Sequence, residues 1–186
     1  RSTGFRLARG GAREYFGVIP DLSVYAKALA GGFTLSAIGG KRKIFDTLRD
    51  GRTIHAGTYN GNTISLAAGL ATLEALASNT DNHNRMHAYG HAIRKTFEEE
   101  AQKKGLPLCT SGAGTVFNAH FGLDTPPTHY REYAQADMET YTRFRANMLK
   151  NKVQLLPDGR WYVGLSHTDK ELEIAQQAIC DSFQKL

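Results

Sequence analysis

The first 61 residues constrain the fold most, because glycine and turn residues recur there at short intervals. The apolar runs Leu22–Tyr25 and Leu35–Ile38 have the length of strands, and they predict short buried strands as in a parallel sheet. Lys41–Leu48 predicts a short helix. From Asn62, a good N-cap, to Ala77 the chain is apolar on nearly all sides, which predicts a helix buried between layers. The chain therefore begins with part of an α/β domain.

A different pattern begins after residue 79. Amphipathic periodicity predicts helices over residues 81–104, ended by Gly105, over residues 131–150, and from a capping box formed by Thr168 and Glu171. Their expected inward residues are Met86, Tyr89, Ile93, Phe97, Ala101, Ala134, Met138, Tyr141, Met148, Leu172, Ala175, Ile179 and Phe183. Thr115–Phe121 predicts a strand, and residues 153–156 and 161–165 predict a strand pair around a turn. We expect residues 1–79 to belong to a large α/β domain and residues 80–186 to form a small α+β domain on an antiparallel sheet.

The composition excludes several classes of protein. The 186 residues are 41% hydrophobic and 22% charged, as in globular proteins rather than disordered chains. The formal net charge of +5 is spread along the chain, and the Lys41–Lys43 cluster is too short for a nucleic-acid patch. No apolar run reaches the roughly 20 residues that a membrane helix needs. Cys109 and Cys180 lie far apart without metal-ligand spacing, which suits a reducing cytoplasm.

Lys27 is the most informative single residue. It is a lone cation in the apolar, glycine-ended segment Asp21–Phe33. Lysines are rarely buried without a partner, so this setting predicts a side chain that has lost part of its hydration. An uncharged amine can form a Schiff base with an aldehyde. The alternative is a lysine whose stem crosses apolar surface while its head stays in water.

Several motifs together resemble the class III (fold type I) aminotransferases that depend on pyridoxal 5′-phosphate, in the branch of glutamate-1-semialdehyde aminomutase. They are Thr3–Arg6, Gly10–Ala12, Tyr15–Val18, Pro20–Leu22, Lys27, Gly31–Phe33, Gly39–Gly40, His55–Asn62, Leu156–Pro157 and Ser166–Thr168. The resemblance covers nearly the whole chain in order. It implies the end of a fold type I large domain followed by a small α+β domain.

The resemblance assigns roles to particular residues. Lys27 would be the Schiff-base lysine, which holds the cofactor and moves a proton while amino groups pass through a pyridoxamine form. Gly57 and Thr58 would bind the cofactor phosphate of a partner subunit in a homodimer; the alternative is a plain turn that caps a helix. Ala26, Ala30 and Thr34 depart from the glycines and proline that the family usually has around its lysine.

The substrate is less constrained by the sequence. Arg160 resembles an arginine that receives a substrate carboxylate in aminotransferases, with a surface arginine beside a turn as the alternative. Aminomutases tend to carry Glu in this region, and residues 158–162 contain none, which favours an aminotransferase acting on small amino and keto acids. Arg6 is a second candidate cation, better explained by a structural ion pair. His55 and His167 fit structural roles better than catalytic ones, and no spacing indicates a metal site.

We also expect a chain that begins partway through its family's sequence. An Asp–Glu pair precedes Thr3–Arg6 in the family and would lie before Arg1, so the resemblance implies a C-terminal portion of a longer enzyme. Two rivals to the aminotransferase remain: a glutamate-1-semialdehyde 2,1-aminomutase, and a catalytically incomplete fragment that serves only as an interaction module. Exposed interfaces would make the isolated chain poorly soluble.

Overall fold

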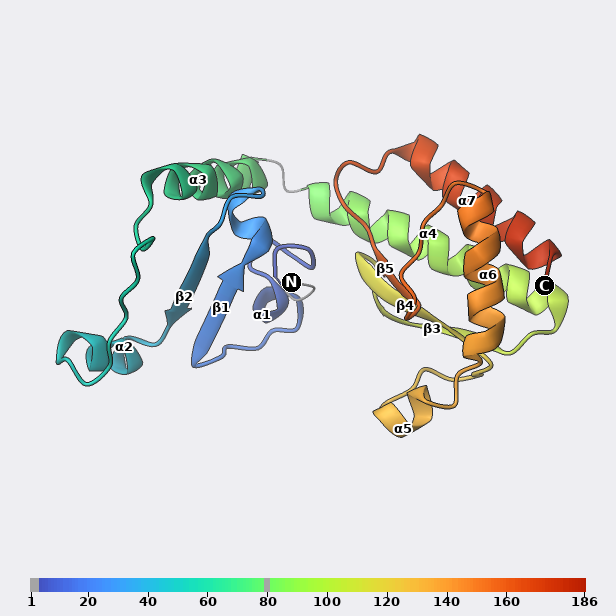
Figure 1. Ribbon diagram of the computed structural model, residues 1–186, viewed down its shortest axis with the longest axis horizontal. Coiled ribbons are helices and arrows are strands. Elements are labelled where there is room, and N and C mark those ends of the chain that lie inside the picture. The colour runs from blue at the N-terminus through green and yellow to red at the C-terminus, as the bar shows by residue number, and fades with distance from the viewer. Residues whose placement is uncertain (1–3, 79–80) are drawn as a thin grey trace. The chain divides into compact units, whose positions relative to one another are not determined.

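The computed structural model describes residues 4–78 and 81–186, which belong to two compact units, Arg1–His83 and Asn84–Leu186 (Figure 1). A domain boundary was expected near residue 79, and positions 79 and 80 lie outside the described residues. Each unit has a sheet of its own, and each is described here by itself.

The first unit is built around a two-stranded sheet. Its elements are α1 (Ala12–Tyr15), β1 (Leu22–Ala26), the 3-10 turn η1 (Lys27–Ala30), β2 (Ser36–Gly40), α2 (Arg42–Arg49) and α3 (Thr63–Ser78). β1 and β2 are antiparallel, with Leu22 opposite Gly40 and Ala26 opposite Ser36. The expectation of parallel strands is therefore wrong for this pair. The reason is the connection over residues 27–35, which is shorter than the dozen or more residues that a parallel crossover needs.

Helix α3 begins as the sequence predicted, but its surroundings differ. The Asn62 side chain accepts the Ser65 N–H at 3.0 Å, which confirms the N-cap. Within the helix only Ser65 and Gly69 are buried, whereas Ile64 is 64% and Leu70 is 59% exposed. The expectation of a helix buried between layers is therefore wrong for this chain, because neighbouring elements cover α3 on one side only.

The second unit packs helices on a three-stranded antiparallel sheet of order β3-β4-β5. Its elements are α4 (Asp81–Lys104, which belongs to this unit from Asn84 onward), β3 (Leu108–Ala113), β4 (Val116–Phe121), α5 (Tyr130–Tyr133), α6 (Met138–Lys150), β5 (Arg160–Tyr162) and α7 (Asp169–Gln184). The expected antiparallel sheet is present. The predicted pairing of residues 153–156 with 161–165 is wrong, because β5 pairs with β4 and residues 153–156 form no strand. Strand β3 was not predicted.

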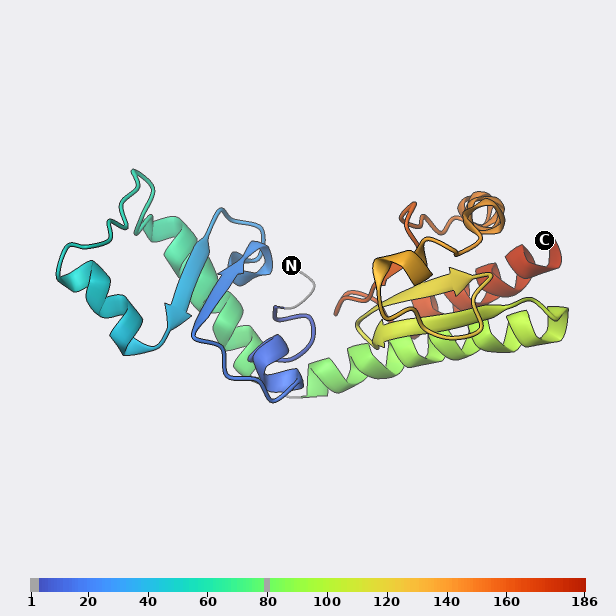
Figure 2. The same ribbon diagram turned by 90° about the horizontal axis from the view of Figure 1, so that it is seen from below.

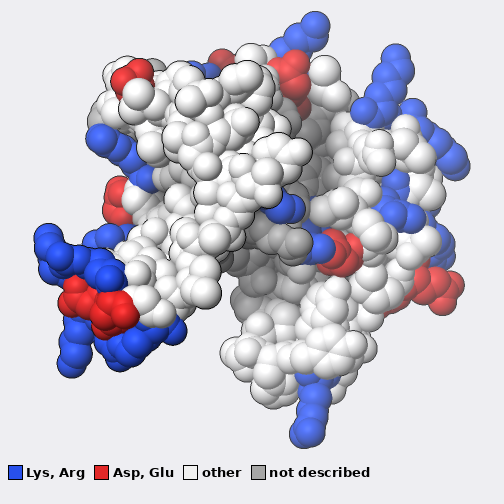
Figure 3. Space-filling model, turned by 60° about the vertical axis from the view of Figure 1, so that its left-hand side comes forward, with Lys and Arg blue, Asp and Glu red and all other residues white. Residues whose placement is uncertain are grey.

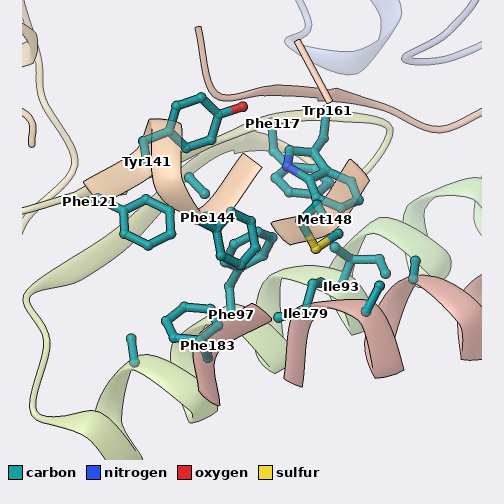
Figure 4. Packing of buried hydrophobic residues seen from close by; sticks show 14 of the residues in the cluster. Ile93, Phe97, Phe117, Phe121, Tyr141, Phe144, Met148, Trp161, Ile179 and Phe183 are labelled. Carbon is teal, nitrogen blue, oxygen red and sulfur yellow. The ribbon is translucent and has the colours of Figure 1, made fainter. Parts of the chain in front are cut away.

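An aromatic cluster fills the space between one face of this sheet and α4, α6 and α7 (Figure 4). Phe97 of α4 lies at its centre, with its ring 5.3 Å from Phe144 and 5.5 Å from Trp161. Helices α4 and α7 lie side by side in both views, with the rings of Phe97 and Phe183 6.0 Å apart (Figures 1 and 2). Most of the predicted inward residues are buried in this cluster, but Ala134 and Met138 are exposed.

Local hydrogen bonds explain where the helices of this unit begin and end. Thr168 and Glu171 form the predicted capping box at the start of α7. Gly105 ends α4 with a positive φ of 63°, as expected. Residues 131–150 were predicted as one helix, but the Asp137 carboxylate accepts the Thr140 N–H at 2.9 Å and starts α6 separately from α5.

Candidate functional site

Lys27 is the first residue of η1 and follows directly on β1. Its φ is +57°, in the left-handed region that residues with a Cβ rarely adopt. Its side chain is exposed, while Leu29 and Ala30 on the same turn are buried. The expected loss of hydration at Lys27 is therefore absent in this chain, because the apolar character of the segment comes from Leu29 and Ala30 rather than from a pocket around the amine.

Helix α3 fixes the turn that carries Lys27. A Cβ placed on Gly69 of α3 would lie 3.7 Å from the Leu29 carbonyl oxygen and 2.7 Å from Cδ2 of Leu35. Gly31, at the end of η1, is left-handed with a φ of 58°. A Cβ on Gly31 would lie 3.3 Å from Oγ1 of Thr72 on α3. Small residues on both elements therefore let α3 pack directly on the lysine turn.

A cleft of about 430 Å³ lies beside this turn within the first unit. Ala26 and Ala28, which flank Lys27 in the chain, line it together with Phe5 and Tyr25. The rings of Phe5 and Tyr25 are stacked with their centroids 5.6 Å apart. This aromatic pair was not predicted from the sequence, in which its only signal is the place of Tyr25 two residues before Lys27.

Gly57 and Thr58 lie in an exposed loop that leads into α3. Two successive turns shape the loop, with the Asn60 N–H donating to the Gly57 carbonyl at 3.0 Å and the Asn62 N–H to Tyr59 at 3.1 Å. Backbone N–H groups and a hydroxyl before a 16-residue helix provide donors suited to an anion. In the described part of the chain, no hydrogen bond links Gly57 or Thr58 to Lys27; α3 connects the two regions, since it starts after this loop and packs on η1.

Arg160, the candidate for substrate binding, is held by its own turn. Its Nε donates to Oδ2 of Asp158 at 2.7 Å, a terminal nitrogen contacts the same oxygen, and its other terminal nitrogen donates to the Tyr162 hydroxyl at 3.3 Å. Hydrogen bonding from Arg160 lowers the pKa of Asp158 below its usual range, so the pair is charged at neutral pH. Arg160 also lines a cleft of about 450 Å³ beside β5 with Trp161 and Tyr89.

The same local geometry occurs elsewhere in the chain. Residues 50–52 repeat the Asp-Gly-Arg sequence of residues 158–160, and Arg52 Nε donates to Asp50 at 2.8 Å. The central glycines, Gly51 and Gly159, have φ values of 76° and 80°. The Asp158–Arg160 pairing is therefore a property of the turn. What distinguishes Arg160 from Arg52 is its contact with Tyr162 and its place in a cleft.

Among the remaining candidates, His167 has hydrogen-bond and ring contacts of a structural kind. The His167 Nδ1 accepts the Gly164 N–H at 3.2 Å, and its ring stacks on Tyr89. His55 is exposed in the loop before α3. Arg6 is half-buried in a turn. Among residues 4–78 and 81–186 there is no cluster of three or more side chains that could hold a metal ion, and none of the helices described there has both the length and the hydrophobicity to cross a bilayer.

Comparison with known proteins identifies relatives of this chain in sequence and in structure. The chain is 34% identical over 185 residues to glutamate-1-semialdehyde 2,1-aminomutase of Methanosarcina acetivorans, covering 97% of this chain and 43% of that protein. The structure superposes on an omega-transaminase from Sphaerobacter thermophilus with a TM-score of 0.85 and 25% identity, over 96% of this chain and 42% of the other. It also superposes on a beta-phenylalanine aminotransferase from Variovorax paradoxus with a TM-score of 0.82 and 27% identity, over 94% of this chain and 41% of the other.

The chain thus spans less than half the length of the relatives that it matches, and these superpositions confirm the expected fold class. The sequence model of the class-III aminotransferases matches residues 2–147. The chain belongs to the class-III aminotransferase family.

Proposed function

We propose that the protein is an aminotransferase that uses pyridoxal 5′-phosphate, with Lys27 as the residue that binds the cofactor covalently. The observation that carries this proposal is the position of Lys27, an exposed residue on a turn that packs on α3, in a chain of the class-III family. Relatives named as transaminases and aminomutases support the same chemistry.

The residues present fit this cofactor. When bound, it supplies an electron sink that stabilises negative charge at the Cα of an amino acid. The Lys27 Nζ would bind its aldehyde carbon and, once displaced by a substrate amine, would carry the proton at the substrate Cα. The Gly57 N–H and the Thr58 hydroxyl would hold the phosphate at the start of α3, in the partner subunit of a homodimer. Such an enzyme would work in the cytoplasm.

The substrates are proposed to be small amino and keto acids. Arg160 would receive a carboxylate with the donors that Asp158 and Tyr162 leave unused, since a guanidinium has five N–H groups. The name of the Methanosarcina relative favours a second candidate, an aminomutase that acts on glutamate 1-semialdehyde. An assay with an amino donor and a keto acid, run beside one with the semialdehyde alone, separates the two activities.

The first experiment is to trap the lysine. The chain is mixed with pyridoxal phosphate, reduced with borohydride and mapped by mass spectrometry, with the exposed Lys43 as the internal reference. Modification concentrated at Lys27, and lost in Lys27→Ala, supports the proposal. Labelling spread evenly over exposed lysines would favour the third possibility, an interaction module without chemistry of its own.

The role of Arg160 has a matched control in the chain. Arg160→Gln and Arg52→Gln each remove an arginine from the same kind of turn. Weaker binding of a keto acid in Arg160→Gln alone, measured by calorimetry, supports a carboxylate site there. An equal effect in both variants would reduce Arg160 to a surface arginine beside a turn.

A further inference from the structure

The backbone at Lys27 is unusual for a residue with a side chain. Within residues 4–78 and 81–186, Lys27 and Lys152 are the two non-glycine residues with positive φ, at 57° and 65°. A left-handed backbone brings the Cβ too close to the following carbonyl oxygen, and lysine has no short polar group to compensate. Glycine would adopt either conformation without that penalty.

Lys152 has an ordinary reason for its conformation. It follows the last turn of α6, where its N–H donates to the Leu149 carbonyl at 3.0 Å and the Val153 N–H donates to Met148 at 2.9 Å. These bonds form the common helix ending in which one residue is left-handed. Lysine is less favourable than glycine at this helix-ending position, and the helix ending itself accounts for the left-handed backbone.

No such ending explains Lys27. It lies at the start of a short turn rather than at the end of a helix, and Ala26 before it is extended, with φ −161° and ψ −171°. The left-handed backbone therefore occurs at Lys27 itself, where the chain leaves β1. A position with this requirement would favour glycine or asparagine if only stability mattered.

The structure on both sides holds the residue in place. Before it, Ala26 is paired with Ser36 in the sheet. After it, Leu29 is 6% exposed and Ala30 is fully buried, and both contact α3 near Gly69. Strained residues persist where the surrounding structure fixes them from several sides, and they cluster at functional sites.

We propose that Lys27 is a strained position kept for its amine, and that the left-handed backbone fixes the direction in which the side chain leaves the turn. The inference rests on the proposed function in so far as it assigns the amine a task. It adds that this turn would be more stable without the lysine, and that the same amine one residue along would not serve.

The strain can be measured without any cofactor. Trp161, the only tryptophan of the chain, lies in the other unit, so its fluorescence does not report on this turn. The measurement is therefore hydrogen exchange of peptides covering β1 and β2, with β4 peptides as the internal reference. Protection in Lys27→Gly should exceed that in Lys27→Ala by roughly three- to fivefold, with Lys27→Asn between them. Equal or lower protection in Lys27→Gly would overturn the inference and leave the proposed function standing.

Two other lysines calibrate this measurement. Lys152→Gly should exceed Lys152→Ala by a similar factor in the peptides of α6, because its backbone is also left-handed. Lys43 lies within α2, where the backbone is helical, so in the peptides of α2 Lys43→Gly should be less protected than Lys43→Ala. The gain at Lys27 is attributed to strain if Lys152 shows it and Lys43 does not; a similar gain at Lys43 would overturn that interpretation.

The direction of the amine is tested by moving it. The double variant Lys27→Gly with Ala28→Lys keeps an exposed amine on the turn while relieving the left-handed position. Borohydride trapping with pyridoxal phosphate should modify the amine at position 28 no faster than Lys43, whereas Lys27 in the unchanged chain should react faster than Lys43. Equal trapping at positions 27 and 28 would overturn the positioning role. Absence of selective trapping at Lys27 in the unchanged chain, with the gain in protection still present, would instead contradict the proposed function.

Discussion

His120 shows at the scale of one residue how burial controls charge. It is 3% exposed on β4, its Nε2 lies 2.8 Å from the Ser111 hydroxyl, and its ring packs edge-on against Tyr133. Burial lowers the pKa of His120 below its ordinary value of 6.5. The side chain is therefore neutral in the folded protein at pH 7, and a proton would enter a site that offers little hydration.

This burial predicts how stability depends on pH. Between the lowered folded pKa and the unfolded pKa near 6.5, the unfolded chain binds more protons, so the free energy of unfolding rises with pH in that window. Acidification from pH 7.5 to 5 should therefore destabilise the unchanged protein more than His120→Gln. The measurement is urea unfolding followed by Trp161 fluorescence at both pH values. An identical pH dependence in the two proteins would contradict the prediction.

At the scale of an element, α4 depends on one glycine. A Cβ on Gly90 would lie 1.5 Å from the Gly114 carbonyl oxygen, so the helix and the β3–β4 connection touch through their backbones. Gly→Ala inside a helix normally stabilises by about 1 kcal/mol. We predict the opposite sign here, a loss of about 3 kcal/mol or more, because backbone must move. Thermal unfolding of Gly90→Ala measures it.

A control in the same helix separates packing from helix propensity. Ala88 is exposed two residues away, and Ala88→Gly should cost only about 1 kcal/mol. If Gly90→Ala were as stable as the unchanged protein, the close contact with Gly114 would not constrain α4.

Arg94 of α4 protects the outer edge of strand β3. Its guanidinium donates to Thr110 Oγ1 at 2.8 Å and to the Gly112 carbonyl at 3.0 Å. These groups lie on the edge strand of the sheet, where unpaired carbonyls could recruit another chain. Arg94→Met should lower the free energy of unfolding by about 1–3 kcal/mol in urea unfolding, since the Thr110 hydroxyl and the Gly112 carbonyl lose their charged donor. Lys95→Met, which removes only a surface ion pair with Glu99, should change it by less than about 1 kcal/mol; equal losses would contradict this role.

At the scale of the whole molecule, the first unit leaves apolar surface uncovered. α3 contains one charged residue, Glu74, and exposes Leu66, Leu70 and Leu73 by 41–59%. Figure 3 shows a broad surface without charged side chains on the side of this unit that faces the viewer. Exposed apolar patches of this kind promote association.

We therefore predict that the isolated chain self-associates at micromolar concentration in sedimentation velocity. Leu70→Glu should reduce association several-fold, because it places a charge on the exposed face of α3. Gln102→Glu adds the same charge to an exposed position of α4 and should leave association unchanged. A monomeric, freely soluble unchanged chain would contradict the prediction.

Features that depend on neighbouring residues in the chain could be predicted from the sequence. The caps at Asn62 and Thr168 and the end of α4 at Gly105 follow from side chains and backbone within a few residues, so local chemistry determines them. Lys27 emerged in the same way, as a cation out of place in its segment, and its role as a cofactor lysine remains a prediction.

What the sequence could not determine depends on contacts between distant residues. The antiparallel pairing of β1 with β2, the pairing of β5 with β4, and the presence of β3 are decided by which segments meet in space. The exposure of Lys27 and of one side of α3 is decided by which elements cover them, and hydrophobic pattern alone does not show that. Only the tertiary structure revealed the left-handed backbone at Lys27, because that conformation is imposed by the sheet on one side of the turn and by α3 on the other.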